Sequence, residues 1–190
     1  MAKPRRSGLT GLAKEERGRD RFETNVEKSE DTIRNEPVEH MIMMDNEGNI
    51  LYKTTDNKSD EVSPSAEMLA KFTDAVVSHN HPRGSCFSPQ DIYVAMYYQL
   101  KQIRATTANN GTFVLQRIHK TGAPPREDYA NFVYLYQEFR SSVSSEIQAG
   151  IFNGTIPYDM TVIRKIENER VSEFLTETAP KFGWRFRKER

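Results

Sequence analysis

This sequence has almost no cysteine, no long apolar run and no excess of charge of either sign. Its single cysteine, Cys86, excludes an intramolecular disulfide framework and any zinc site built from several thiolates. No stretch approaches the roughly 18 apolar residues that a membrane-spanning helix needs. Lysine plus arginine and aspartate plus glutamate both total 27, so the basic excess typical of nucleic-acid-binding domains is missing. These absences leave histidine and carboxylate as metal ligands, and they argue against a membrane or nucleic acid as a partner.

The chain divides into three parts by composition. Residues 1–36 are highly charged, with apolar residues scattered singly, so burial cannot offset their chain entropy and we expect a disordered or loosely helical arm. Residues 37–122 include the closely spaced pair His79 and His81 and are expected to form a metal-binding domain, and residues 123–190 a helical C-terminal extension that packs on it. The basic start at residues 3–6 is followed by no apolar signal-peptide core, so we expect a cytoplasmic protein.

The middle of the chain carries the signals of a mixed sheet flanked by helices. Apolar runs at residues 38–44 and 49–55 surround the turn Asp45-Asn46-Glu47-Gly48, which predicts a β-hairpin. Further strands are predicted at residues 75–78, 104–107 and 112–118. The expected fold class is α/β, more narrowly α+β.

Helix signals occupy the remaining segments. Ser88-Pro89-Gln90-Asp91 offers a capping serine, a proline in the first turn and an acidic residue in capping-box position. Apolar residues three or four apart predict long helices over residues 129–147 and 160–174. The basic end, residues 181–190, is expected to be solvated.

Metal-ligating side chains are concentrated between His79 and Asp91. In extended backbone, residues two apart point to the same side, so His79 and His81 can face one point at the end of the strand at residues 75–78. Asp91 lies in the first turn of the next helix, where the helix dipole favours its ionised form. Two histidines and one aspartate form a three-ligand set of the kind that catalytic zinc uses, with a fourth position open for water.

For a zinc-bound water to attack an amide bond, the site also needs a group that takes a proton from the water and returns it to the leaving nitrogen. Glu39 is the best candidate, because a charged residue leading a buried strand needs a partner, and a neighbouring strand that ends at His79 could supply one. Glu36 is the reserve. Ser88 could cap its helix and also donate a hydrogen bond to a developing oxyanion.

The order of these residues resembles the JAMM motif of MPN-domain zinc metalloproteases, over roughly Val38 to Ile118. The matching positions are Glu39, His79-Asn80-His81-Pro82, Gly84, Ser88 and Asp91. The resemblance implies an MPN-type mixed sheet, with Zn²⁺ bound by His79, His81 and Asp91. It also implies that Glu39 transfers the proton and that Ser88 stabilises the oxyanion.

The loop between the second histidine and the serine departs from the common pattern of the family. RadC-like members usually have seven residues there, whereas Pro82 to Phe87 is six. This shorter loop, together with Glu39-His40 and Ile103-Arg104-Ala105, is more similar to variants in phage head-morphogenesis and polymorphic-toxin proteins. That resemblance implies a bacterial or phage origin.

The implied function is hydrolysis of an amide bond by a metal-activated water. The enzyme would be a metalloprotease or an isopeptidase acting on a protein or peptide, with ubiquitin-like proteins among the candidates. The alternative is a non-catalytic MPN-like scaffold in a phage or defence-related assembly. A distant third is a metal-dependent nuclease, suggested by the letters His-Asn-His, although that class scatters these residues over a ββα unit.

Four nearby residues are predicted to have no direct part in the chemistry. His40 and His119 lack partners in the motif and are expected at the surface or behind the ligands. Asn80 is expected to be a bystander, and Cys86 to be a small packing residue.

Overall fold

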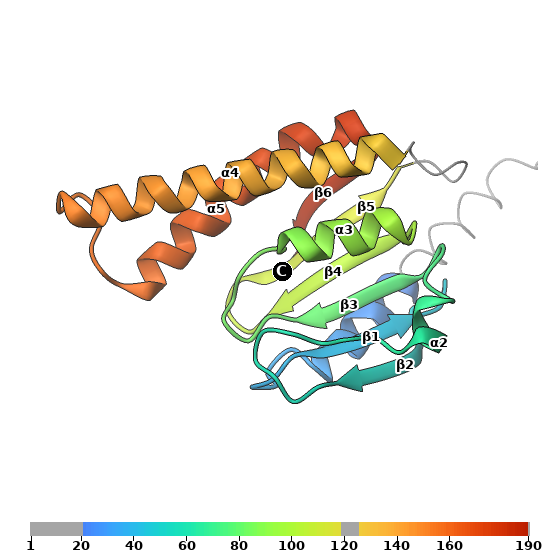
Figure 1. Ribbon diagram of the computed structural model, residues 1–190. Coiled ribbons are helices and arrows are strands. Elements are labelled where there is room, and N and C mark those ends of the chain that lie inside the picture. Colours follow the sequence, from blue (N-terminus) through green and yellow to red (C-terminus); the bar gives the residue numbers. More distant parts are fainter. Residues whose placement is uncertain (1–20, 119–125, 190) are drawn as a thin grey trace, which may run out of the picture.

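The computed structural model describes residues 21–118 and 126–189, which form a six-stranded mixed sheet flanked by helices (Figure 1). The strands are β1 (His40–Met44), β2 (Ile50–Thr55), β3 (Val76–Asn80), β4 (Gln102–Thr107), β5 (Gly111–Arg117) and β6 (Trp184–Glu189). Their order across the sheet is β2-β1-β3-β4-β5-β6. The β3–β4 pair is parallel and the other four neighbouring pairs are antiparallel. The predicted α/β (α+β) class is confirmed.

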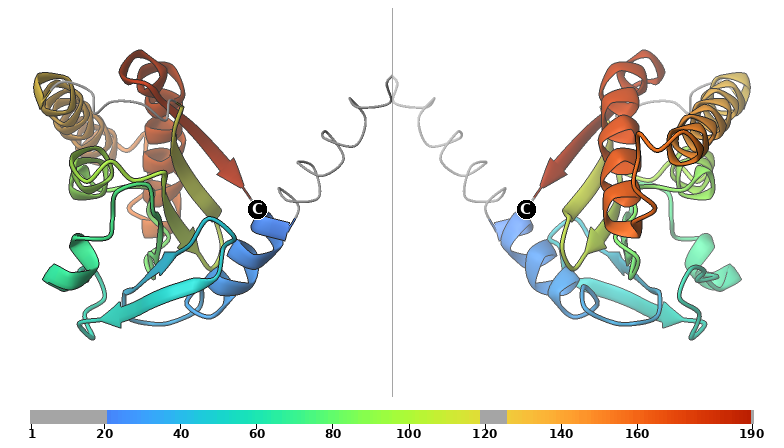
Figure 2. Two further views of the ribbon diagram at one scale, coloured as in Figure 1. Left: turned by 90° about the vertical axis from the view of Figure 1, so that its right-hand side faces the viewer. Right: turned by 90° about the vertical axis from the view of Figure 1, so that its left-hand side faces the viewer.

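The helices lie on both faces of this sheet. They are a helix that includes residues 21–31, α2 (Ala66–Leu69), α3 (Pro89–Tyr97), α4 (Arg126–Phe152), α5 (Met160–Thr178) and the short 3₁₀ helix η1 (Ala179–Phe182). In Figure 2 the N-terminal helix lies against one face, while α3, α4 and α5 lie toward the other. Among the described residues, no helix is long and apolar enough to cross a membrane.

Alternation along the central strands separates two apolar cores. On β3, Val77 belongs to the larger core with α3, α4 and α5, while its neighbour Val76 belongs to a smaller core with Val26 and Ile33 of the N-terminal segment. Because side chains alternate across a strand, His79 shares the larger-core face and Ser78 the other. The metal-site motif therefore lies on the face that the C-terminal helices cover.

The N-terminal segment is more ordered than the predicted arm. Residues 21–31 are helical, and Val26 and Ile33 are buried against Ile42 and Val76. The helical option expected for this arm holds for residues 21–31, but the helix is packed on the sheet and not loose; its buried face is partly polar and gives little apolar periodicity. Residues 1–20 lie outside the described residues.

The C-terminal end is an edge strand of the sheet and not a solvated tail. Trp184 is fully buried and Phe186 nearly so, whereas Arg185 between them is exposed. β6 pairs with β5 in antiparallel register, with Leu115 opposite Phe186. The basic residues of this segment conceal a period of two, which is the reason that the sequence prediction missed the strand.

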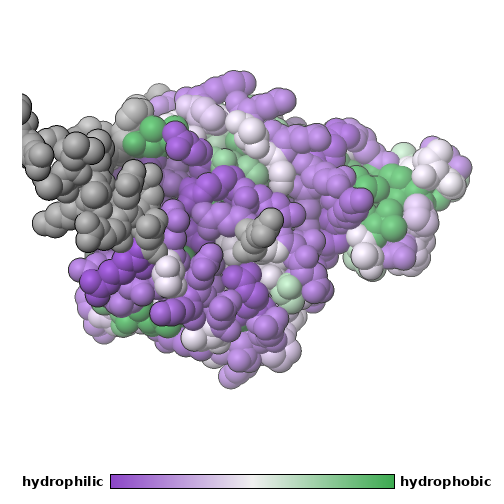
Figure 3. Space-filling view, turned by 180° about the vertical axis from the view of Figure 1, so that it is seen from behind, coloured by the Kyte–Doolittle hydropathy of each residue, from purple (hydrophilic) through white to green (hydrophobic). Residues whose placement is uncertain are grey.

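Helices α4 and α5 form a long hairpin that extends beyond the sheet. Their predicted cores, residues 129–147 and 160–174, fall inside the observed helices. Seen from behind, the tip of this hairpin carries a hydrophobic patch on an otherwise mostly hydrophilic face (Figure 3). At the end of α4, Phe152 is 96% exposed, and in the connection to α5, Tyr158 is 84% exposed.

Candidate metal centre

Two paired strands bring Glu39 and the histidines together. In the β1–β3 pair, Met41 lies opposite His79, so Glu39, directly before β1, lies beside the end of β3. Glu39 and Met41 are two apart and share one face of the sheet. The amide N–H of Glu39 donates to the carbonyl oxygen of Lys58 at 2.6 Å, which fixes the backbone before the strand. Glu39, Met41 and His79 are all buried.

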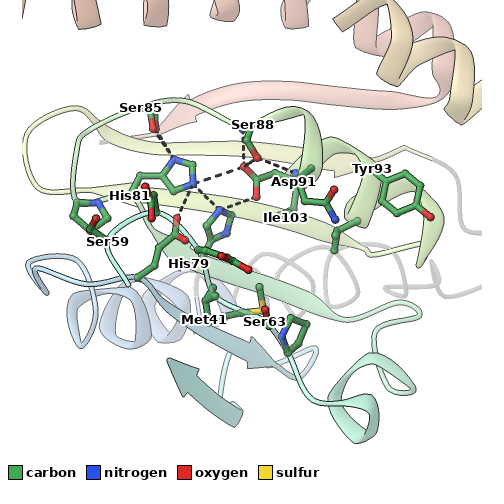
Figure 4. Close-up of a pocket in the computed structure, with 18 of the residues that line it drawn as sticks. Met41, Ser59, Ser63, His79, His81, Ser85, Ser88, Asp91, Tyr93 and Ile103 are labelled. Atoms are coloured by element: carbon green, nitrogen blue, oxygen red, sulfur yellow. Dashed lines mark hydrogen bonds and ion pairs between the residues drawn. The ribbon is translucent and has the colours of Figure 1, made fainter. Parts of the chain in front are cut away.

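Four side chains converge in the space between these strands and α3 (Figure 4). The Nε2 atoms of His79 and His81 lie 2.7 Å apart. His79 Nε2 is 3.1 Å from Asp91 Oδ1, and His81 Nε2 is 3.7 Å from Asp91 Oδ2. His81 Nε2 is also 3.5 Å from Glu39 Oε1. We call Glu39, His79, His81 and Asp91 the metal-site cluster.

The start of α3 orients Asp91. Ser88 is the N-cap: its hydroxyl accepts from the amide N–H of Asp91 at 3.2 Å, and the Ser88 N–H donates to Asp91 Oδ2 at 2.6 Å. The Ser88 hydroxyl also donates to Asp91 Oδ2 at 2.8 Å. This reciprocal capping box engages Oδ2 and leaves Oδ1 directed at His79. The predicted helix start is confirmed.

The site loop, which we define as residues 82–88, orients His81. The Nδ1 atom of His81 lies 2.8 Å from the carbonyl oxygen of Ser85, and a carbonyl oxygen can only accept a hydrogen bond. His81 therefore carries its proton on Nδ1, and the lone pair of Nε2 is directed into the metal-site cluster. Metal-ligating histidines commonly have this arrangement.

Burial and mutual charge shift the pKa values of all four groups. Burial raises the pKa of Glu39 to about 7, with the charge of His79 opposing and that of Asp91 reinforcing the shift. Burial and the charge of His79 lower the pKa of His81 to about 4. Against burial, the charge and hydrogen bond of His79 hold the pKa of Asp91 well below its usual range, and Asp91 in turn raises the pKa of His79. The cluster is thus a buried set of acceptors that attracts positive charge.

This donor set fits a divalent metal ion. Donor atoms of Glu39, His79 and His81 all lie within 4.8 Å of one another, and the group could hold a metal ion. Asp91 contacts His79 more closely than Glu39 does, so the two carboxylates, Glu39 and Asp91, are both candidates for the third ligand position. Two imidazole nitrogens with carboxylate oxygen are ligands that zinc accepts.

The cluster opens onto a pocket of about 930 Å³. Apolar side chains of Met41, Leu69, Val94 and Tyr98 form part of its wall, and residues 59–64 form another part. Arg164 of α5 also lines it, so the C-terminal extension contributes to the same pocket as the motif. A pocket of this size is within the range that encloses most of a drug-sized ligand.

Asn80 is not the bystander that the sequence suggested. It is fully buried on the opposite face, and its side-chain oxygen accepts from the amide N–H of His40 at 2.7 Å. Its amide group donates to the carbonyl oxygens of Glu36 and Val38 at 3.1 and 3.0 Å. Asn80 therefore ties the backbone on both sides of Glu39 to β3, and Glu36, the reserve base, contributes its carbonyl there.

Other predicted residues fall near the site without joining it. Cys86 is buried in the larger core, and burial raises its thiol pKa far above the usual range, as expected for a packing residue. His40 Nε2 lies 3.9 Å from the carboxylate of Glu36. His119 lies outside the described residues.

Sequence reasoning missed Asn168 of α5. This side chain is only 7% exposed and contacts the site loop from the C-terminal extension. A polar residue three positions before the buried Val171 was the available signal. No protein-family model, curated protein or solved structure gives a significant match to this chain, so the site itself carries the evidence on function.

Proposed function

We propose that this protein is a zinc-dependent hydrolase of amide bonds of the JAMM type, acting as a metalloprotease or an isopeptidase. One observation carries the proposal: the two histidine Nε2 atoms and the Asp91 carboxylate converge within 2.7 to 3.7 Å, with Glu39 beside them, at the wall of a large pocket. The order of these residues along the chain matches the JAMM motif, and their geometry is consistent with it.

His79, His81 and Asp91 would hold the Zn²⁺ ion. When bound, zinc would act as a Lewis acid and make a water molecule nucleophilic near neutral pH. The Nδ1–H of His81, bound to Ser85, keeps the Nε2 lone pair available as a ligand. The capping box with Ser88 holds Asp91 in place, so this carboxylate needs little reorganisation to bind.

Glu39 would move the proton. It lies 3.5 Å from His81 Nε2, whereas Asp91 contacts both histidines, at 3.1 Å from His79 and 3.7 Å from His81, so Asp91 is the better third ligand and Glu39 is left to act as a base. Burial raises its pKa to about 7, near the value at which a group both accepts and returns a proton efficiently. Glu39 would take a proton from the attacking water and donate it to the leaving amine.

Ser88 has a defined supporting role and a conditional catalytic one. Its hydroxyl donates a hydrogen bond to Asp91 Oδ2. Ser88 also lines the pocket, so rotation of the hydroxyl would direct its proton toward a substrate carbonyl oxygen. To stabilise an oxyanion, Ser88 must therefore give up its hydrogen bond to Asp91 and donate to the substrate oxygen instead.

The metal content of the purified protein tests the proposal. We expect about one zinc per chain in the wild type and none in a His79→Ala, His81→Ala double variant. Asp91→Asn should lower zinc affinity strongly, whereas Glu39→Gln should retain zinc and lose hydrolysis. If Glu39→Gln loses zinc and Asp91→Asn keeps it, Glu39 is the third ligand and the assigned roles are wrong. A wild type without stoichiometric zinc would refute the site.

The scaffold alternative predicts a different combination of results. The exposed apolar tip of the α4–α5 hairpin favours a contact role, because exposed large apolar side chains mark interaction surfaces. A scaffold would retain zinc, cleave nothing in a peptide library or a ubiquitin-like fusion, and keep its biological activity in Glu39→Gln.

The nuclease alternative has little support in the structure. Asn80 faces away from the two histidines and is engaged by backbone groups, so the three letters His-Asn-His do not form one site. Metal-dependent nicking of plasmid DNA that is lost in His79→Ala would favour this alternative.

A further inference from the structure

Side chains of the C-terminal helices hold the site loop in place. Asn168 Oδ1 of α5 accepts from the amide N–H of Cys86 at 2.8 Å, and Asn168 Nδ2 donates to the carbonyl oxygen of Gly84 at 2.8 Å. One amide group thus binds the peptide units on both sides of Ser85. The two bonds span 82 and 84 positions of the sequence, so they connect separate parts of the chain.

Ser85 is the residue that sets the proton position of His81. Its carbonyl oxygen accepts the Nδ1–H of His81 at 2.8 Å, and its hydroxyl lies 3.2 Å from the same nitrogen. If the peptide plane of Ser85 turned, His81 would lose this acceptor and could carry its proton on Nε2 instead. A proton on Nε2 excludes metal binding through that atom.

The site loop has few other means of holding this carbonyl. Gly84 has a positive φ of 72°, a conformation that glycine adopts without strain but does not enforce. Asn110 Nδ2 also donates at 2.9 Å to the Gly84 carbonyl oxygen, which lies before Ser85 in the chain, whereas Cys86 follows Ser85. Among the polar contacts of the described residues, only that of Asn168 joins both flanks of Ser85.

A second contact anchors the end of the loop to α4. The hydroxyl of Tyr136 donates to the carbonyl oxygen of Phe87 at 2.6 Å, directly before the capping residue Ser88. Arg140 Nη1 donates to the same oxygen at 3.2 Å. Both helices of the extension therefore bind the backbone that connects His81 to Asp91.

We propose that Asn168 is a positioning residue of the metal site: by clamping Gly84 and Cys86, it presents the Ser85 carbonyl to His81 and so keeps His81 Nε2 unprotonated for a metal ion. The C-terminal extension then completes the site and is not an independent appendage. This inference rests on the proposed function for the identity of the metal, but the tautomer of His81 can be measured without metal.

Asn168→Leu tests the inference, because leucine has the same branched shape as asparagine and lacks both hydrogen bonds. Zinc dissociation constants from competition with a chromogenic chelator should rise by about 10- to 100-fold, the usual cost of removing a group that orients a ligand. In metal-free protein, imidazole ¹⁵N shifts should report His81 protonated on Nδ1 in the wild type and a mixture of both tautomers in Asn168→Leu.

Ile163→Ala is the matched control. Ile163 lies on the same helix but belongs to a separate apolar cluster with Val143 and Ile147. Its truncation should lower the melting temperature while zinc affinity and the His81 tautomer stay as in the wild type. A purely structural role of α5 would instead make both variants lose affinity in proportion to stability.

Asn168→Asp decides the matter if the leucine variant does not fold. Aspartate keeps the acceptor for the Cys86 N–H and loses the donor to Gly84, so an intermediate loss of zinc affinity is expected. Affinity within twofold of the wild type and an unchanged tautomer in the folded variants would overturn the inference. If the wild type binds no zinc, the proposed function fails, and the tautomer measurement still tests the clamp.

Discussion

The two faces of the sheet each bury a cluster of ionisable groups, and the two clusters differ in how their charges are paired. On one face lies the metal-site cluster. On the other lies what we call the Glu30 network, formed by Glu30, Arg104 and Glu189. Ser78 and His79, neighbours on β3, belong to opposite clusters. The same strand thus supports both.

The carboxylates of the Glu30 network are paired with arginines: Arg104 contacts both, and Arg34 and Arg187 each contact one. Glu30 Oε1 accepts from Arg104 Nε at 2.6 Å and from the Ser78 hydroxyl at 2.9 Å, and Arg104 Nη2 donates to Glu189 at 2.5 Å. The metal-site cluster instead directs two imidazole nitrogens and two carboxylates at one another with no lysine or arginine among its contacts in the described residues. Burial alone therefore does not mark a candidate functional site, whereas a buried excess of acceptors does.

Removing a charge from the Glu30 network should have the largest effect on stability. Glu30→Ala leaves the buried Arg104 with fewer partners, and we expect the free energy of unfolding to fall by about 3–5 kcal/mol. Chemical denaturation measures this loss. Glu23→Ala, an exposed change on the same helix, should have little effect. Zinc content per folded chain should stay at the wild-type value; if it drops, the two clusters are coupled and the contrast between them is wrong.

Removing the charge of Glu39 should affect chemistry and leave the fold intact. For Glu39→Gln we expect the hydrolysis rate to fall by about 10²- to 10⁴-fold, because general acid–base catalysis contributes factors of that size. Stability should stay the same or rise, since a buried group with a raised pKa is easier to bury when neutral. Hydrolysis by Glu39→Gln at the wild-type rate would remove Glu39 from the mechanism.

Chelation should destabilise the protein through the metal-site cluster alone. At free zinc 100-fold above its dissociation constant, binding contributes about 2.7 kcal/mol, which EDTA should remove and added zinc restore. The melting temperature measures the change. The His79→Ala, His81→Ala variant should show no response to EDTA, whereas Glu30→Ala should show the full response from its lower starting point.

Zinc affinity should rise with pH up to the raised pKa of His79. The pKa of His79 is raised, so the metal-free protein retains a proton there at a pH where an ordinary histidine has lost it, and that proton must leave when zinc binds. Release of one proton gives a change of about tenfold in affinity for each pH unit below the pKa of His79. Calorimetry in buffers of different ionisation enthalpy counts the protons; uptake on binding would contradict the assignment.

Removing the cap of α3 should have the smallest effect. Ser88→Ala is expected to cost about 0.5–2 kcal/mol of stability and to weaken zinc binding modestly, because Asp91 loses its hydroxyl partner. Ser65→Ala removes the corresponding cap of α2 and should lower stability without changing zinc affinity. If both variants bind zinc equally well, the capping box does not orient Asp91.

The sequence predicted those elements whose signals are local. The hairpin of β1 and β2, the helix start at Ser88 and the spacing of two between His79 and His81 follow from turn chemistry, capping and strand alternation within a few residues. The residues of the metal-site cluster were selected in the same way, because the order of the motif is local except for Glu39, and the structure brings their side chains together. Its position beside His79 depended on strand pairing, which the structure provides.

The remaining features depend on distant partners and gave no local signal. Glu30 is explained by partners far away in the sequence, above all Arg104, 74 positions later, and the order of the N-terminal helix follows from that contact and from the small core beneath it. Asn80 and Asn168 are polar residues in apolar surroundings, and each makes sense only with the backbone groups that it binds. A single sequence shows such residues as exceptions to a pattern without showing their partners.

The contact between Asn168 and the site loop also sets a time at which the site can be complete. Asn168 follows Asp91 by about 80 positions, which at about 5–20 residues per second corresponds to about 4–16 s of synthesis. During that interval the motif exists in the growing chain without its clamp. If the clamp is needed for metal binding, the metal-site cluster can hold an ion only after residue 168 has been made and α5 has folded back onto the sheet.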